Sequence, residues 1–532
     1  MQVNYVKDIS IVSAAAVIFL AVSWIGFYGG DDWQYSEAAR QWLSEGLFLG
    51  KTHWSVRHTH VLPIAASYAI FGLGEFQLLL PSLVFYFTSL IIIYALLNKF
   101  IGREAALISC LLLSSTPILV FITTMTRPDI TEAFFVLLSV WFFWNAPHSA
   151  VQNRMLFVAG LAAGLAWMTR ETSVSLLLVF GLLFLAGRRI NRNYYWIMAA
   201  GFFVILAIDA LYSTLMSGNP LYRYITIISS HGAQLSKNVG YQISLLGVGE
   251  TASSAAGNIS LHWSIDPLIA ILANQEFGLL FWFSIPAGLW LCFSRKVDPG
   301  HRELAQFFSL LAVVWFVAVS YGLGLREQPR YYTIPSIASA VLIGIAFTES
   351  AIVISRAGRI ALISLLILVN LFCFYIDNDD PLYEERAAVR LAGEMAEPIY
   401  TNANSALMAN RLLQIKQLPG VVSDALPPPG AIYFYVPCKE ENIPCNTLKQ
   451  PDKNPEFEPE KLRSEWTPVW RDDPGRKLSG ILIEKLNLKQ FVPASIYYKL
   501  DYPSLPVTAY RLPGVKTDAP DILNQNSHMR SQ

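Results

Sequence analysis

Long apolar runs alternate with short polar segments from the N-terminus to about residue 376. A run of about 20 apolar residues crosses the hydrocarbon core of a bilayer as a helix, and a run of 17 suffices with little tilt. We therefore predict an α-helical polytopic membrane protein with about 11 transmembrane helices. The predicted spans are 9–29, 76–97, 104–122, 129–146, 154–169, 172–186, 195–216, 277–293, 303–323, 331–349 and 358–376.

The first apolar run has the form of a secretory signal, because Lys7 and Asp8 precede the apolar segment 9–28. The run is longer than the apolar core of a signal peptide, no small-residue cleavage motif follows it, and many further spans come after it. We expect an uncleaved first helix.

Basic residues gather in one alternating set of short loops, which predicts that these loops face the cytoplasm. The opposite loops (30–75, 123–128, 170–171, 217–276 and 324–330) and everything after 376 should then lie outside, in the periplasm of an inner-membrane protein. The basic residues of the cytoplasmic set are Lys99, Arg103, Arg154, Arg188, Arg189, Arg192, Arg295, Lys296, Arg302, Arg356 and Arg359.

Two of the predicted outer loops are long. In loop 30–75, apolar positions recur at helical spacing over 35–43, which predicts an amphipathic helix on the membrane surface, and 61–71 predicts a second interfacial helix. Residues 217–264 are polar and rich in Gly and Ser, so we expect a mobile loop over the site.

The composition changes after Asp377, where the chain becomes charged and rich in proline. Strand-like runs at 431–436 and 480–483 predict a small soluble α/β domain over 377–532, following a membrane domain over 1–376, with a frayed tail after 517. Cys438 and Cys445 are the only cysteines of this part, and in an oxidising compartment we expect them to form a disulfide.

Overall composition agrees with a membrane protein and excludes several functions. Of the 532 residues, 54% are hydrophobic and 15% are charged, against about 25% charged in a soluble domain. The net charge is zero and no basic block is present, which argues against a nucleic-acid partner. No Walker A, HExxH or CxxC motif supports ATP-driven transport or metalloprotease chemistry.

Acidic residues stand at the predicted outer mouth of the helices. Asp31 and Asp32 follow the first span, and Asp129 follows the polar turn 123–128. Aspartate is a common helix N-cap, so each position has a purely structural reading. A charge beside a bilayer is costly, and two acidic sites in distant loops on one face favour function.

Three motifs give the chain a family resemblance. They are Asp31-Asp32 followed by Tyr35, Glu37 and Ala39-Arg40; Asp129 at the start of the fourth span; and Arg330-Tyr331 followed by Pro335. Over residues 1–350 the chain resembles the C-type (GT-C) membrane glycosyltransferases that use polyprenyl-phosphate sugars, which include the protein O-mannosyltransferases and the lipid A aminoarabinose transferases. At 57–63 it reads Arg-His-Thr-His-Val-Leu-Pro, where the aminoarabinose branch carries an acidic-Lys-Pro-Pro stretch, which weakens the match to that branch.

The resemblance implies transfer of a sugar from a lipid phosphate to an acceptor hydroxyl, with inversion at the anomeric carbon. It makes Asp31 the catalytic base and Asp129 the residue that orients the acceptor or assists the base. Arg330 is the main candidate for the donor phosphate, since arginine forms a bidentate fork with phosphate. The further substrate-binding candidates are Asp32, Tyr35, Arg57, His60, Arg170, Glu276 and Tyr331.

Several alternatives stay open at this level. Arg170 and Glu171 could neutralise each other in a tight turn, and Glu276 could be an ordinary helix-end residue. The acceptor is a glycolipid such as lipid A of lipopolysaccharide, a polysaccharide or a protein, and the sequence does not decide whether a divalent metal takes part. The rival function is a transporter or flippase of a lipid-linked glycan, which would place charges near the bilayer midplane in broken helices.

Overall fold

The computed structural model describes residues 2–235, 266–323, 328–350, 354–377, 382–395, 397–435, 465–492, 497, 500–501 and 506–513. The chain divides into two compact units. One contains residues 1–381 and 476–503, and the other contains 382–475 and 504–532. The placement of a soluble domain at 377–532 remains a prediction.

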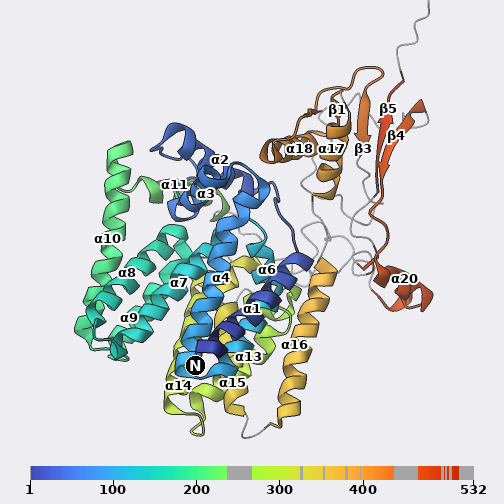
Figure 1. Cartoon of the computed structure of the whole chain (residues 1–532). Coiled ribbons are helices and arrows are strands. Elements are labelled where there is room, and N and C mark those ends of the chain that lie inside the picture. Colours follow the sequence, from blue (N-terminus) through green and yellow to red (C-terminus); the bar gives the residue numbers. More distant parts are fainter. Residues whose placement is uncertain are drawn as a thin grey trace, which may run out of the picture. The chain divides into compact units, whose positions relative to one another are not determined.

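The first unit is helical (Figure 1). Its main helices are α1 (Gln2–Val22), α2 (Asp31–Glu45), α3 (His58–Phe71), α4 (Glu75–Phe100), α5 (Arg103–Ser115), α6 (Pro117–Thr123), α7 (Pro128–Asn145), α8 (Gln152–Thr169), α9 (Val174–Ala186), α10 (Arg192–Ser217), α11 (Tyr222–Leu235), α12 (Asp266–Ala273), α13 (Leu280–Phe293), α14 (Pro299–Val317), α15 (Thr333–Glu349), α16 (Arg356–Asp377) and α20 (Leu478–Lys485).

The polytopic membrane architecture is confirmed, although the number of spans is smaller on a strict count. Within the described residues, 7 helices are long and apolar enough to cross a membrane, and 8 if α5 and α6 form one span. That pair bends by 65° at Thr116, whose extended backbone is the conformation that a following proline favours. All the predicted spans fall largely on helices, but several are short, and the figure of about 11 remains a prediction.

Two sequence-based boundaries are wrong. The first helix ends at Val22 rather than at residue 29, because Gly26 and Gly29 adopt left-handed φ angles of 76° and 82°. The chain turns there, and the Gly26 N–H donates to the carbonyl of Thr124 at 3.0 Å. The segment 217–264 was expected to be a loop, yet its first part forms α11; residues 236–265 lie outside the described part.

Close helix packing places α8 beside α10. A Cβ added to Gly160 would lie 2.0 Å from the carbonyl oxygen of Met198, and one added to Gly201 would lie 2.2 Å from that of Phe157. Only glycine permits this approach of two backbones. Arg170 directly follows the last residue of α8, so this packing also fixes the position of the Arg170 backbone.

The helices α2 and α3 form a layer near α11 at one end of the long helices (Figure 1). The Ser36 and Tyr68 hydroxyls join α2 to α3 at 2.8 Å. Both helices occur where the sequence predicted interfacial helices. Their position on a membrane surface remains a prediction.

The second unit contains a five-stranded sheet in the order β2-β1-β3-β5-β4. The strands are β1 (Ile399–Tyr400), β2 (Val422–Ser423), β3 (Ile432–Tyr435), β4 (Thr467–Asp472) and β5 (Val507–Arg511). The first three are parallel, and β5 pairs antiparallel with both β3 and β4. Helices α17 (Tyr383–Glu394) and α18 (Ala403–Lys416) accompany the sheet.

The strand expected at 431–436 is confirmed as β3, whereas the one expected at 480–483 is wrong. That segment is part of α20, in the helical unit. A short apolar run does not distinguish a strand from a helix. Cys438 and Cys445 lie outside the described residues, so their disulfide remains a prediction.

Candidate active site

Asp31 occupies the first turn of α2, but it does not cap the helix. Gly30 is the N-cap, and it makes no side-chain cap bond. The Asp31 carboxylate accepts hydrogen bonds from Trp54 Nε1 at 3.0 Å and from Arg330 Nη1 at 2.9 Å, and it pairs with Arg127. Burial raises the pKa of Asp31, but the charges of Arg127 and Arg330 outweigh it and hold this pKa below its ordinary value. Asp31 is therefore ionised.

Asp32 lies next to Asp31 in a different environment. Its side chain is fully buried and accepts a hydrogen bond from the Tyr28 N–H at 2.8 Å. Burial raises the pKa of Asp32 to about 6, even though the charge of Arg127 opposes the shift. The pKa of Asp31 is thus lowered and that of its neighbour Asp32 is raised, relative to an ordinary aspartate.

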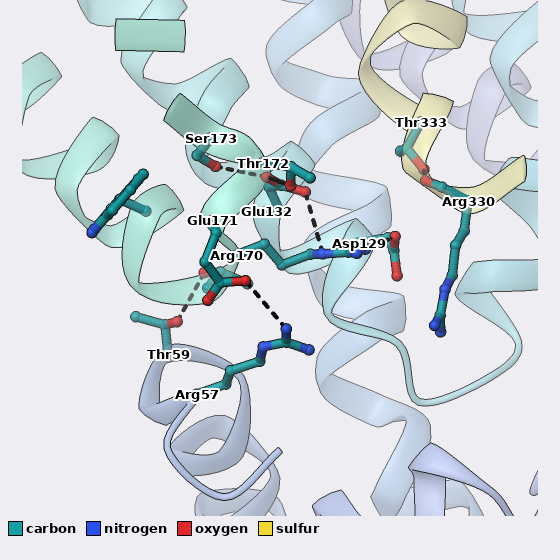
Figure 2. Close-up of polar contacts among 12 residues, drawn as sticks. Arg57, Thr59, Asp129, Glu132, Arg170, Glu171, Thr172, Ser173, Arg330 and Thr333 are labelled. Atoms are coloured by element: carbon teal, nitrogen blue, oxygen red, sulfur yellow. Dashed lines mark hydrogen bonds and ion pairs between the residues drawn. The ribbon is translucent and has the colours of Figure 1, made fainter. Parts of the chain in front are cut away.

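Asp129 lies in the first turn of α7, after Arg127 and Pro128, and is 1% exposed. The N-cap position, Arg127, makes no side-chain cap bond, and Asp129 instead forms an ion pair with Arg170 (Figure 2). One turn further on, Glu132 accepts hydrogen bonds from the hydroxyls of Thr172 at 2.5 Å and Ser173 at 2.7 Å. Five charged or polar side chains thus link the start of α7 to the turn after α8.

The alternative in which Arg170 and Glu171 neutralise each other is wrong. Arg170 pairs with Asp129, whereas Glu171 accepts from Arg57 at 3.3 Å (Figure 2). Glu171 also pairs with Arg223 at 3.5 Å. Successive side chains in an extended backbone point to opposite sides, and Arg170 is extended with φ −153° and ψ 146°.

Tyr331 joins the two carboxylate centres. The guanidinium carbon of Arg170 lies 4.5 Å from the centre of its ring, and that of Arg330 lies 5.6 Å from it. Arg330 binds Asp31, and Arg170 binds Asp129. Residues from three distant loops therefore meet in one network, and Figure 2 shows Asp129 drawn between the side chains of Arg170 and Arg330.

Arg57 and His60 lie on the α3 side of the network. Arg57 is the residue before α3, and its Nη1 donates to the Tyr35 hydroxyl at 3.0 Å. His60 Nδ1 lies 2.9 Å from Thr131 Oγ1, and its ring packs edge-on against Tyr35 at 4.6 Å. Burial, followed by the charges of Arg57 and Arg170, lowers the pKa of His60 to about 3. His60 is therefore a neutral hydrogen-bonding group rather than a cation.

Glu276 lies in a short 3-10 helix, η3 (Gln275–Phe277), before α13. Its N–H donates to the side chain of Asn274 at 2.8 Å, which is the cap of a helical turn. A role in substrate binding remains a prediction for this residue.

Sequence reasoning missed Arg127 and Arg223. Arg223 is 1% exposed, and its Nη2 donates to the carbonyls of Trp167 at 3.2 Å and Met168 at 2.9 Å while also pairing with Glu171. The signal was present, because both arginines lie in loops predicted to face outward, where basic residues are uncommon.

The network contains donors that have no acceptor. Arg57 Nε, Arg330 Nε and Arg223 Nη1 are shielded from solvent and have no hydrogen-bond partner among the described residues. Unpaired buried donors are costly, and the oxygens of an anion are strong acceptors for arginine N–H groups. Within the same described part, no three His, Cys, Asp or Glu side chains form a metal-binding group.

Comparisons with known proteins give a match for one segment and for the fold. Residues 59–212 match the family model described as dolichyl-phosphate-mannose-protein mannosyltransferase. No curated protein matches the chain by sequence.

The fold resembles that of ArnT from Cupriavidus metallidurans. The structure of that protein bound to undecaprenyl phosphate matches with TM-score 0.54 and 16% identity, over 78% of this chain and 85% of the other. Its apo structure matches with TM-score 0.53 and 14% identity, over 79% and 86%. The apo oligosaccharyltransferase of Archaeoglobus fulgidus matches with TM-score 0.49 and 14% identity, over 77% and 64%. The expected resemblance is confirmed in the ArnT-like fold of the chain and in the mannosyltransferase match of residues 59–212.

Proposed function

We propose that this protein is an integral-membrane glycosyltransferase that moves a sugar from a polyprenyl-phosphate donor to an acceptor hydroxyl. One observation carries the proposal: Asp31, Asp129, Arg170 and Arg330 form a single network through Tyr331. A carboxylate base beside arginines that can bind phosphate is the set of groups that this reaction needs.

The donor phosphate is proposed to bind the arginines. Arg330 is the first candidate. Arg57 and Arg223 both pair with Glu171, and each keeps an N–H group that has no partner among the described residues. Arginine forms charge-assisted, bidentate bonds with phosphate, which stabilise the leaving group as its charge grows. ArnT of Cupriavidus metallidurans has been solved with undecaprenyl phosphate, which supports a polyprenyl phosphate as the carrier here.

Donor binding would also activate the base. In the free protein, Arg330 and Arg127 hold Asp31 in a strongly ionised, weakly basic form. A phosphate that draws Arg330 away removes one of these cations, and the pKa of Asp31 then rises toward its ordinary value. Asp31 becomes a stronger base when the donor is in place, and wasteful proton abstraction without a donor is avoided.

The proposed transfer is a single nucleophilic displacement at the anomeric carbon of the sugar. The acceptor oxygen attacks the anomeric carbon, the bond from that carbon to the phosphate oxygen breaks, and the acceptor proton passes to Asp31. Polyprenyl phosphate leaves, held by the arginines, and attack from the opposite side inverts the anomeric centre. Asp129, fixed by Arg170, orients the acceptor.

The finer assignments are also proposals. The site and residues 377–532 face the periplasm of an inner membrane, on the basis of the basic residues in the opposite loops. The acceptor is a glycolipid such as lipid A, a polysaccharide or a protein, and a divalent metal ion could assist. Asp32, Tyr35, His60, Glu276 and Tyr331 complete the proposed substrate-binding set.

The test is a transfer assay with protein purified into lipid nanodiscs. Labelled polyprenyl-phosphate sugars extracted from cell membranes are supplied with candidate acceptors, and free polyprenyl phosphate and labelled acceptor should appear together. Movement of intact labelled lipid between the leaflets of sealed vesicles, without release of polyprenyl phosphate, would contradict the proposal and support a flippase.

A further inference from the structure

A second feature lies at the other end of the helix bundle. Helix α7 carries Asp129 in its first turn and Trp144 in its last, and 15 residues of α-helix span about 22 Å. Trp144 lines a cavity of about 360 Å³ between α7, α9 and α14. This cavity is therefore separated from the carboxylate network by most of the thickness of a bilayer.

The cavity has an apolar wall and a polar rim. Trp144, Leu183, Phe307 and Leu310 contribute the wall. The rim is formed by residues just after α9 and in the first turns of α14: Arg188, Arg189, Glu303 and Gln306. An apolar wall below a charged rim is complementary to an acyl chain below a lipid headgroup.

The rim carries an excess of positive charge. Arg188 is exposed and donates to the neutral amide of Gln306 at 3.2 Å, and no carboxylate pairs with it among the described residues. Glu303 pairs with Arg189 at 3.1 Å. Arg192, which donates to the carbonyls of Phe184 and Leu185, adds a further positive charge close by.

Arg189 is held in an unusual position. Its backbone has φ 72°, a left-handed conformation that non-glycine residues rarely adopt. Its guanidinium lies 4.2 Å from the centre of the Trp144 ring, and its Nη2 donates to the Trp144 carbonyl at 2.8 Å. Its Nε is shielded from solvent and has no partner among the described residues. A strained, fixed cation with an unused donor indicates a site for an anionic group.

A second apolar cavity of about 300 Å³ lies on the other side of α9, between α8 and α10. Tyr195 lines it, and the Tyr195 hydroxyl donates to the carbonyl of Arg188 at 2.8 Å. The two cavities thus lie on opposite sides of α9, and only the first is lined by Arg188 and Arg189.

We propose that this end of the protein binds an anionic glycerophospholipid of the leaflet opposite to the carboxylate network. The headgroup phosphate contacts Arg188 and Arg189, and an acyl chain enters the cavity between α7, α9 and α14. The occupant is distinct from the glycosyl donor, whose phosphate belongs to the other face.

Native mass spectrometry of the purified full chain tests the proposal, with phosphatidylglycerol and phosphatidylcholine of equal acyl length as probes. Phosphatidylglycerol should be retained preferentially, and Arg188→Gln should reduce its retention about fivefold, as expected for one lost arginine–lipid contact. The matched control is Arg154→Gln, an exposed arginine of α8 that does not line either cavity. Ala186→Trp should reduce retention by filling the cavity while Arg188 is kept.

Three results would overturn the proposal. One is equal retention of the two phospholipids by the wild-type protein, and another is an equal loss in Arg154→Gln and Arg188→Gln. The third is displacement of phosphatidylglycerol by polyprenyl phosphate or by inorganic phosphate, which would assign the site to the donor or to a free anion. Thermal unfolding of each variant shows that it is folded before its lipid binding is compared.

Discussion

The two neighbouring carboxyl groups, Asp31 and Asp32, differ because their partners differ. Asp31 has two arginines and an indole N–H on its oxygens, so its negative charge is matched. Asp32 has one backbone N–H on Oδ2, and its Oδ1 has no partner among the described residues. In the proposed reaction, Asp31 accepts a proton once Arg330 has moved to the donor phosphate. Asp32 keeps its proton up to a higher pH than an ordinary aspartate, and it fixes the turn before α2 through the Tyr28 N–H.

Asp32 makes stability depend on pH. Its folded pKa of about 6 exceeds that of an unfolded aspartate, so the stability that it contributes is present below about pH 4 and is lost as the pH rises through 6. Asp32→Asn should therefore be more stable than the wild type at pH 7.5, by roughly 3 kcal/mol at most, and similar to it at pH 4. Thermal unfolding at the two pH values measures this difference, with Glu37→Gln of the same helix as control. A variant that is less stable at pH 7.5 would contradict the assignment.

Sequence reasoning reached some of these residues and not others, for physical reasons. Asp31, Asp129 and Arg330 lie in polar segments next to long apolar runs. A charge at such a position is costly beside a bilayer, so the sequence alone identified these residues as candidates. The partner of each was not visible, because Arg170 reaches Asp129 across 41 positions and Arg330 reaches Asp31 across 299. Neighbouring opposite charges suggested the wrong pair at Arg170 and Glu171, since spacing along the chain does not report the direction of a side chain.

At the scale of elements, the contact of α8 with α10 leaves no room for a side chain at Gly160 or Gly201. Arg170 follows the last residue of α8, and Arg223 donates to carbonyls in its last turn. A shift of α8 would therefore move both arginines. The predicted span 154–169 is among the shortest, and the sequence analysis assigned no role to its glycines. Their role becomes clear only when the facing backbone of α10 is known, which explains why the sequence alone did not reveal it.

Substitution at this contact should destabilise the protein. Gly160→Ala places a Cβ against the Met198 carbonyl, a backbone atom that cannot rotate away, and overpacking of this kind costs about 1–3 kcal/mol. Gly181→Ala is the matched control, because it lies inside α9 with no atom within 4 Å of the added Cβ. Thermal unfolding in detergent should show a lower midpoint for Gly160→Ala alone. Equal midpoints for the two variants would show that α8 and α10 do not pack this closely.

At the scale of the molecule, the charges divide between the two ends of the bundle. The carboxylate network lies at the start of α7, and the arginine-rimmed cavity lies near its end. The sequence predicted the helical architecture well, because apolar length is a strong signal. It predicted the exact number of spans less well, since α9 and α13 are short and α5 bends into α6. Length alone does not decide whether such helices cross the bilayer.

The orientation of the molecule is open to a direct test. Because the basic loops predict an external C-terminal part, alkaline phosphatase fused after residue 400 should be active, and β-galactosidase fused there should be inactive. A phosphatase fused in the loop between α9 and α10 should be inactive and provides the control. Cytoplasmic activity of the fusion after residue 400 would reverse the side assigned to the carboxylate network.

The most direct test of the account is the single-turnover rate of sugar transfer in Asp31→Asn, measured together with donor affinity. Asparagine keeps the shape of the side chain and removes the proton acceptor, so the rate should fall by about 10²-fold or more. Donor affinity should be kept or increased, because Arg330 no longer forms an ion pair with residue 31. Arg330→Ala should instead weaken donor binding, and Glu45→Gln, at the exposed end of α2, should change neither quantity. Near-normal transfer by Asp31→Asn would contradict the assignment of Asp31 as the base and, with it, the proposed single site.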